Sequence, residues 1–334
     1  MIYFFIMDNL RNTIATKILS TIPPRVKPID YLMEALDISR ESVYRRIRGD
    51  ISFTLEEIVK LSIDLGFSID ELILNNMQSR VFFDLNSNGI QDASEIFVNT
   101  FQQYFQSMID LPSTGKKTES ITALNHPPFG FIVFFEHLFK FSYFRWMHQH
   151  QESSLNYFYS DVTLPEKLIY QQHITIENMK KVRNETVIFD PNIFLNLIRE
   201  IQYYYRRKLI NENDFSLIKN DLSGMVDMME QISQTGFYSS EIRCNLYLSS
   251  LNIESNSKYI KSDDQVKSFF FTNLMEPITI INPYLCASHK KWLDSIRKYA
   301  TLITQSNEIL QIRYFNKQRA FINDIEDTMS IFPF

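Results

Sequence analysis

The chain has 334 residues, 45% of them hydrophobic and only seven of them glycine, and it carries a formal net charge of −5. No two glycines are closer than twelve residues in the sequence. This excludes the dinucleotide-binding turn and the nucleotide phosphate loop, because each needs several glycines within one turn. The negative charge excludes a protein that coats nucleic acid along its whole length, so any such contact must be local.

Cysteine content and hydropathy predict a cytoplasmic protein. Cys244 and Cys286 are too few for a disulfide framework and are expected to be ordinary thiols in or near the core. The sequence holds no run of about 18 apolar residues that predicts a transmembrane helix, and its apolar start lacks the basic segment of a signal peptide. We expect translation to begin at Met7, with residues 1–6 dispensable; mass spectrometry of the native N-terminus tests this.

The first part of the chain is predicted to be a string of short helices. A helix over residues 8–22 ends at the proline pair 23–24, and a second helix begins at Pro28. A turn at Asp37 follows, and Ser39 is a suitable N-cap for a third helix that ends at Gly49.

Two capping boxes extend this bundle. Thr54 and Glu57 begin a fourth helix that Gly66 ends, and Ser68 and Glu71 begin a fifth helix that runs to about residue 74. We therefore predict one compact five-helix domain over residues 8–78.

The rest of the chain is predicted to be a connecting region, 79–128, and a helix-rich domain, 129–330. The connecting region holds a strand over 80–85, an Asx-rich turn, a helix over 93–109 and a polar loop over 110–128. The helices predicted in the larger domain cover 131–150, 164–182, 191–209, 212–234, 288–304 and 308–325. The predicted fold class is mainly α, in which the bundle precedes a helix-dominated α+β domain with a few short antiparallel strands near residues 245–281.

The stretch from Pro28 to Gly49, PIDYLMEALDISRESVYRRIRG, resembles the phage-repressor-like (XRE-type) helix-turn-helix family of DNA-binding domains. The resemblance continues through residues 53–74 and covers about a fifth of the chain. It implies that the helix before the turn crosses the DNA backbone and that the helix after it enters the major groove. Asp37 departs from the glycine usual at this turn, but aspartate can also take the left-handed conformation at some cost.

The helix over 39–48 has a composition that suits DNA. It carries four arginines against one acid, and a helical wheel turns Val43 and Ile47 inward. Arginine can bind guanine in the major groove, glutamate can accept from cytosine, and serine or tyrosine can bind phosphate. We predict that the DNA-contacting residues are Arg40, Glu41, Ser42, Tyr44, Arg45, Arg46 and Arg48, of which residues 40–44 face bases and Arg45, Arg46 and Arg48 face phosphates. The alternative is a solvated, arginine-rich helix used for protein contacts.

A calcium loop is a further candidate. Residues 84–95, DLNSNGIQDASE, fit the EF-hand pattern, with Asp84, Asn86, Asn88, the carbonyl of Ile90, Asp92 and Glu95 as ligands. The loop has Gln91 where an apolar residue is usual, and no second loop accompanies it. We favour an Asx-rich turn in which Asp92 or Ser94 caps the next helix, and we expect no cofactor, with Ca²⁺ as the alternative.

Two other groups have plain structural interpretations. His148 and His150 are one residue apart without cysteines nearby, so a helix end is favoured over a zinc site. The aromatic stretches 134–146 and 203–208 are expected to be core, rather than walls of a ligand pocket or a platform for stacked bases.

These observations predict a bacterial type of transcriptional regulator that is not an enzyme. The residues 143–149 and 314–319 resemble uncharacterised bacterial helix-turn-helix regulators with a long helical C-terminal region. The expected partners are double-stranded DNA, a second copy of the chain, and a small-molecule, peptide or protein effector at the larger domain, with no membrane. One alternative is a non-DNA-binding interaction module, an antirepressor or scaffold that docks through the bundle. Another is an enzyme whose catalytic part lies in the larger domain.

Overall fold

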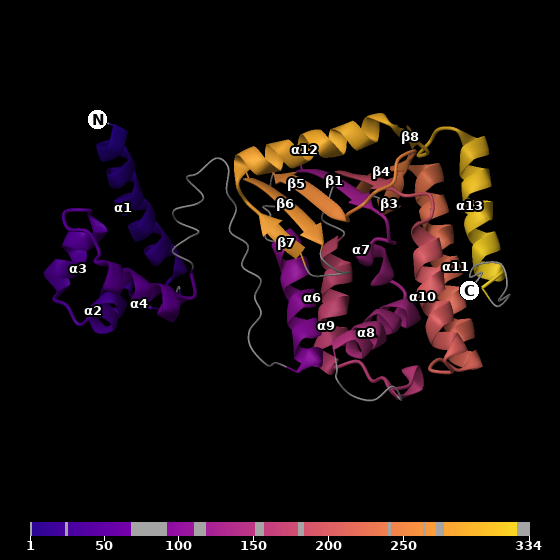
Figure 1. Cartoon of the computed structure of the whole chain (residues 1–334), viewed down its shortest axis with the longest axis horizontal. Helices are drawn as coiled ribbons and strands as arrows, with labels where there is room; N and C mark the ends of the chain where they lie inside the picture. Colours follow the sequence, from indigo (N-terminus) through magenta and orange to yellow (C-terminus); the bar gives the residue numbers. More distant parts are fainter. Residues whose placement is uncertain are drawn as a thin grey trace. The chain divides into compact units, whose positions relative to one another are not determined.

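The computed structural model describes residues 2–23, 26–67, 92–109, 118–150, 157–179, 184–239, 242–262, 265–271 and 277–325. The chain divides into two compact units, residues 1–84 and residues 85–334, both drawn in Figure 1. Within the part that is described, no helix is both long enough and apolar enough to cross a membrane.

The smaller unit is a bundle of short helices. In chain order these are α1 (Ile2–Thr21), α2 (Pro28–Leu36), α3 (Arg40–Ile47) and α4 (Leu55–Leu65). Their packing buries a small apolar core made of Ile18, Ile22, Leu32, Val43, Leu61 and Phe67. The predicted fifth helix, from Ser68, and the strand predicted over 80–85 lie outside the described residues.

The helix ends of the smaller unit follow the predicted signals. Asp37 ends α2 in the left-handed conformation, with φ of 51°, and Ser39 caps α3 by accepting a hydrogen bond from the Ser42 N–H. Thr54 and Glu57 form both hydrogen bonds of the capping box at the start of α4. Gly66 ends α4 with φ of 69°, a conformation that costs glycine little. These predictions are confirmed.

The helices of the larger unit match the predicted ones in broad position. They are α6 (Ala93–Ile109), α7 (Phe129–Ile132), α8 (Glu136–His150), α9 (Glu166–Met179), α10 (Ile193–Arg206), α11 (Glu212–Thr235), α12 (Pro283–Lys298) and α13 (Glu308–Asn323). The single helix predicted over 131–150 is wrong in detail, because α7 ends at Ile132 and α8 begins four residues later. The helix predicted over 288–304 ends at Lys298, and a short strand follows it.

A mixed sheet forms the centre of the larger unit. Its strands are β1 (Thr118–Leu124), β2 (Asn184–Phe189), β3 (Phe237–Ser239), β4 (Ile242–Ser249), β5 (Ser257–Ser262), β6 (Gln265–Phe271), β7 (Pro277–Ile280) and β8 (Ala300–Leu302). The order is β3-β4-β2-β1-β5-β6-β7, and β8 also pairs with β4. β1, β2 and β4 are parallel to one another, whereas the other pairings are antiparallel. The prediction of a few antiparallel strands near 245–281 therefore covers only part of the sheet.

The predicted polar loop over 110–128 is wrong where β1 lies. β1 pairs with β2 on one side and with β5 on the other, so it is an interior strand. Its polar side chains Ser120 and Thr122 are buried, which is why its composition resembles a loop. α6, also expected in the connecting region, packs against α8 and α9 in the same unit and buries Phe97 and Phe101 completely.

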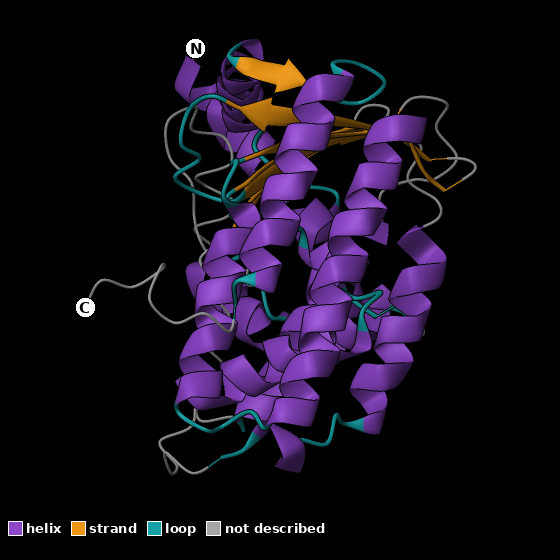
Figure 2. Ribbon diagram, turned by 90° about the vertical axis from the view of Figure 1, so that its right-hand side faces the viewer, coloured by secondary structure: helices purple, strands orange, loops and turns teal. Residues whose placement is uncertain are grey.

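The larger unit is layered. Figure 1 shows α12 lying along one face of the sheet while the other helices extend from its opposite side, and Figure 2 shows those helices side by side. α12 contacts β1, β4, β5, β6 and β8, and α11 contacts β3 and β4. One continuous aromatic core joins α6, α8, α10, α11 and α13. The two cysteines are free and buried, as predicted.

Candidate nucleic-acid interface

α3 is positioned by the turn that precedes it. The left-handed backbone of Asp37 reverses the chain after α2, and the Ile38 N–H donates to the Met33 carbonyl across the turn. Ser39 then begins α3 with its hydroxyl oxygen on the Ser42 N–H, at 3.3 Å. A local signal therefore sets both the start and the direction of the helix.

The helix turns its apolar side inward, as the wheel predicted. Val43 is 1% exposed and belongs to the core of the smaller unit, and Ile47 packs against that core. On the outward side the exposed residues are Arg40, Glu41, Tyr44, Arg45 and Arg48. Ser42 is half-buried and its hydroxyl accepts a hydrogen bond from that of Ser39.

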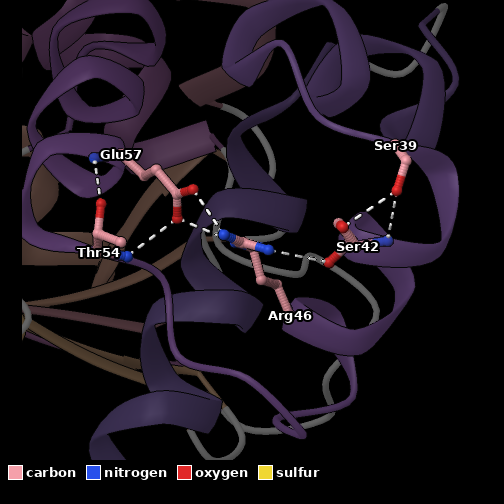
Figure 3. Close-up of polar contacts among 5 residues, drawn as sticks. All are labelled: Ser39, Ser42, Arg46, Thr54 and Glu57. Carbon is pink, nitrogen blue, oxygen red and sulfur yellow. Dashed lines mark hydrogen bonds and ion pairs between the residues drawn. The ribbon is translucent and has the colours of Figure 1, made fainter.

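Arg46, which the sequence predicts as a phosphate contact, is instead bonded within the bundle. Its Nε and Nη2 atoms donate to the two carboxylate oxygens of Glu57 at 2.9 and 2.7 Å, and its Nη1 donates to the Ser42 carbonyl (Figure 3). Only 12% of the Arg46 side chain and 16% of the Glu57 side chain are exposed. A two-point bond of this kind fixes the guanidinium, so Arg46 is a positioning residue that ties α3 to α4.

Glu57 is the functional partner that sequence reasoning missed. It was assigned only to the capping box, but its carboxylate also receives the Arg46 pair. Burial acts to raise the pKa of this carboxyl, and the hydrogen bonds from Arg46 and from the Thr54 N–H outweigh burial, so the pKa is lowered. The one sequence signal for this ion pair is the position of Arg46 beside Val43 and Ile47, at the edge of the apolar inward face of the helix, where a charged side chain needs a partner.

The outward arginines differ in what neutralises them. Arg48 lies 3.7 Å from a Glu41 oxygen and 3.4 Å from an Asp50 oxygen, with its side chain 60% exposed. Arg40 and Arg45 have no ion-pair partner among the described residues. Two exposed guanidinium groups on one capped helix can bind guanine edges or phosphate oxygens without first breaking an internal bond.

The calcium candidate is only partly within the described structure. Asp84, Asn86 and Asn88 lie outside the described residues. Asp92 precedes α6, and its carbonyl accepts from the Ile96 N–H, while Glu95 is exposed in the first turn. The hydroxyl of Ser94 accepts from Tyr143 and is not a helix cap. Among the residues that are described, no three His, Cys, Asp or Glu side chains are placed to hold a metal ion.

The histidine pair and the aromatic stretches have structural roles. His148 bonds to the Tyr157 carbonyl and His150 bonds to the Trp146 carbonyl, so the two imidazoles serve different backbone groups near the end of α8. Phe139, Phe141 and Phe144 are buried core residues. The prediction of core packing is confirmed for these rings and for Tyr204, whereas Tyr203 is 50% exposed and is not a core residue.

The chain matches no protein-family model, and comparisons with curated proteins and with solved structures give no match either. The resemblance of residues 28–74 to the phage-repressor-like family therefore stays a prediction.

Proposed function

We propose that the protein is a sequence-specific DNA-binding transcriptional regulator that reads the major groove with α3. The observation that carries the proposal is the pair of exposed arginines, Arg40 and Arg45, which have no ion-pair partner among the described residues and lie on a helix with a capped start and a buried inward face. Ser42, Glu41 and Tyr44 lie on the same helix and can add contacts to bases or phosphates. Arg48 would contribute after releasing two exposed ion pairs, which are worth little in water.

Arg46 has a separate part in this proposal. Its bond to Glu57 holds α3 against α4, so it supports the DNA-contacting surface without belonging to it. We therefore take it out of the contacting set and keep Arg40, Glu41, Ser42, Tyr44, Arg45 and Arg48.

The larger unit is proposed to bind an effector or to hold two copies together. A bundle of this size neutralises few phosphates, and operators commonly contain two half-sites about 34 Å apart. A homodimer is therefore expected to be the DNA-binding form. Sedimentation velocity of the chain with and without its duplex measures this directly, and one copy per duplex would contradict the dimer.

Replacing Arg40 and Arg45 together tests the proposal. A duplex is first obtained by selection from random sequences, and the affinity of the full chain is measured by fluorescence anisotropy. We expect Arg40→Ala with Arg45→Ala to weaken specific binding about a hundredfold or more, because the change removes a base contact of Arg40, worth about 1–3 kcal/mol, together with a phosphate contact of Arg45. The melting temperature should not change, because both side chains are exposed.

A matched control removes the same charge elsewhere. Arg313 and Lys167 are exposed residues of the larger unit, so the variant with both changed to alanine has the same net charge. It should keep specific affinity. If the two variants bind equally well, α3 does not contact the DNA.

One observation favours an interaction module as the second candidate. Leu55, Val59 and Ile63 repeat at four-residue spacing along α4 and are 66%, 39% and 74% exposed. An exposed apolar stripe of this kind is typical of a protein contact. The random-duplex selection separates the candidates, because an interaction module returns no enriched sequence.

A further inference from the structure

A cavity of about 360 Å³ opens beside α12 in the larger unit. Its walls come from α12, from β6 and β7, and from the segment between β4 and β5. The residues that form it include Phe270, Ile280, Leu285, Ser288, His289 and Trp292. Ligand sites in proteins have volumes of about 300–1,000 Å³ and are mainly apolar with a few polar groups, and this cavity fits that description.

His289 is the buried polar residue of the cavity wall. The residue is 6% exposed, and its Nδ1 atom lies 2.9 Å from the Ser268 hydroxyl. Its Nε2 atom is buried and has no hydrogen-bond partner in the described structure. An unsatisfied buried polar atom is unfavourable, so a ligand that supplies a partner for Nε2 gains a contact that the free protein lacks.

The imidazole contacts two aromatic rings. Phe270 lies 4.4 Å from it, centroid to centroid, and Trp292 stacks on it at 5.8 Å and 24°. Trp292 is 41% exposed, so its indole lies on the solvent side of the cavity wall, and its displacement would give a ligand access to Nε2.

The chemistry of the walls selects a class of ligand. Burial lowers the pKa of His289 to about 4, so the ring is neutral at neutral pH, and Nε2 donates or accepts according to the tautomer. A hydroxyl group fits either tautomer, because it both donates and accepts. The aromatic walls favour a flat ring. Since a cavity of about 150 Å³ holds benzene, one or two fused rings fit.

Charge and reactivity narrow the class further. Of the residues that line the cavity, Glu254 is the charged one, and it is exposed, which disfavours an anionic ligand. The Ser268 hydroxyl is fully buried and already bonded to Nδ1. Nε2, which has no partner in the described structure, is therefore the atom of this pair that a ligand can bond once Trp292 is displaced. The arrangement is suited to binding.

We propose that this cavity binds a neutral, planar aromatic molecule that carries a hydroxyl group, with the hydroxyl hydrogen-bonded to His289 Nε2. The site lies wholly within the larger unit, so it does not depend on DNA binding by α3.

Calorimetric titration of the full chain with 2-naphthol tests the proposal. We expect saturable binding that Ser288→Trp weakens at least tenfold, because an indole at this exposed rim position fills the mouth of the cavity. The control is Ser295→Trp, since Ser295 is also exposed on α12 but is not part of the cavity wall. The control should bind like the unmodified chain. Absence of binding to the unmodified chain, or equal weakening by both variants, would overturn the site.

A second comparison tests the hydrogen bond. His289→Phe keeps a flat ring and removes Nε2, so it should weaken 2-naphthol about tenfold, which is the usual size of such a loss. Binding of 2-methylnaphthalene, which lacks the hydroxyl, should be unchanged when measured by equilibrium dialysis. Melting curves confirm that each variant is folded. If His289→Phe weakens the binding of both compounds equally, or of neither, Nε2 is not the hydrogen-bond partner of the ligand hydroxyl.

Discussion

The two units differ in how much buried structure supports them. In the smaller unit a few apolar side chains form the core, and the Arg46–Glu57 pair ties α3 to α4. In the larger unit one aromatic core extends through helices and sheet. The helix proposed to read DNA thus lies on the less extensively packed of the two. A substitution in the smaller unit can therefore remove binding by unfolding it, and matched changes are needed to separate structural effects from direct contacts.

Truncation of one buried aliphatic residue in each unit should give the largest difference between the units, because one unit should unfold and the other should stay folded. Leu32 and Ile198 are both completely buried, and a change to alanine costs about 2–5 kcal/mol at such positions. That is a large part of the stability of a small domain. We expect Leu32→Ala to unfold the smaller unit and Ile198→Ala to leave the larger unit folded, as measured by the hydrogen-exchange protection of peptides from each.

Tryptophan fluorescence supplies the control. The two tryptophans of the chain, Trp146 and Trp292, both lie in the larger unit, so fluorescence in urea follows that unit alone. Leu32→Ala should leave this transition in place, while Ile198→Ala should lower its midpoint. Equal shifts would mean that the units unfold together.

Alanine substitutions at Arg46 and Arg45, neighbouring positions of α3, should give the next largest difference in stability. Removing Arg46 leaves Glu57 buried without its partner, and we expect Arg46→Ala to cost about 3 kcal/mol in the smaller unit. Arg45→Ala should change stability by less than about 0.5 kcal/mol, because the side chain is exposed. Chemical unfolding followed by hydrogen exchange in α3 and α4 measures both.

The double variant distinguishes the pair from its separate charges. With Glu57→Ala present, Arg46→Ala should cost much less than it does alone, which is the signature of a direct interaction. Additive effects would show that the bond is not important for stability. For DNA affinity the order should be reversed, with Arg45→Ala weakening binding in a fully folded protein.

Local sequence signals were enough to predict the turn and the helix ends of the smaller unit. Asp37, Ser39 and the Thr54–Glu57 box each act on residues next to them, so their effect can be inferred without knowing the fold. The outward position of Arg45 followed from periodicity alone. The partner of Arg46 did not, because Glu57 lies eleven residues away and already had a local role.

The sheet of the larger unit was predicted poorly because its strands are defined by distant partners. β1 pairs with β2 and β5, which lie far away in the sequence, and the buried side chains of Ser120 and Thr122 give it no apolar pattern. The cavity beside α12 combines residues from separate strands with those of the helix. No local pattern around His289 could have indicated it.

Acidification should lower the stability of the two units over different pH ranges, because their titrating groups differ. His289 has a folded pKa of about 4, against 6.5 for the ordinary group. Between these values the unfolded chain binds a proton that the folded chain does not, so the larger unit loses stability as the pH falls from 6.5 toward 4, by about 2 kcal/mol. The lowered pKa of His126 acts in the same direction.

The smaller unit should keep its stability over most of this range. The six histidines of the chain all lie in the larger unit, and the pKa of Glu57 is lowered. The stability that Glu57 supplies is complete above its ordinary pKa of 4.5 and is lost only as the pH falls below it. Urea unfolding at pH 7, 6, 5 and 4, followed by fluorescence and by hydrogen exchange, measures both units. If the unfolding free energy of the larger unit falls with pH as steeply in the His289→Phe variant as in the unmodified chain, groups other than His289 cause the loss of stability.

Alanine substitutions at the helix-ending glycines should give the smallest of these differences in stability. The expected cost is not the same in the two units. Gly66 and Gly236 both have positive φ, 69° and 80°. A methyl group at Gly66 would have no heavy atom within 4 Å, so Gly66→Ala carries only the backbone cost, about 1 kcal/mol. At Gly236 the same methyl group would also lie 3.0 Å from the Gln305 side chain, whose amide bonds to the Thr235 carbonyl.

Gly236→Ala should therefore lower the free energy of unfolding more than Gly66→Ala does. The larger unit can nevertheless lose more stability than the smaller one before it unfolds. Urea midpoints of the two variants measure the difference. Asparagine tolerates the left-handed conformation better than alanine, so Gly66→Asn should recover part of the loss at Gly66. At Gly236 asparagine meets the same Gln305 side chain, and we expect no such recovery. Recovery at both positions would show that the cost at Gly236 comes from the backbone alone.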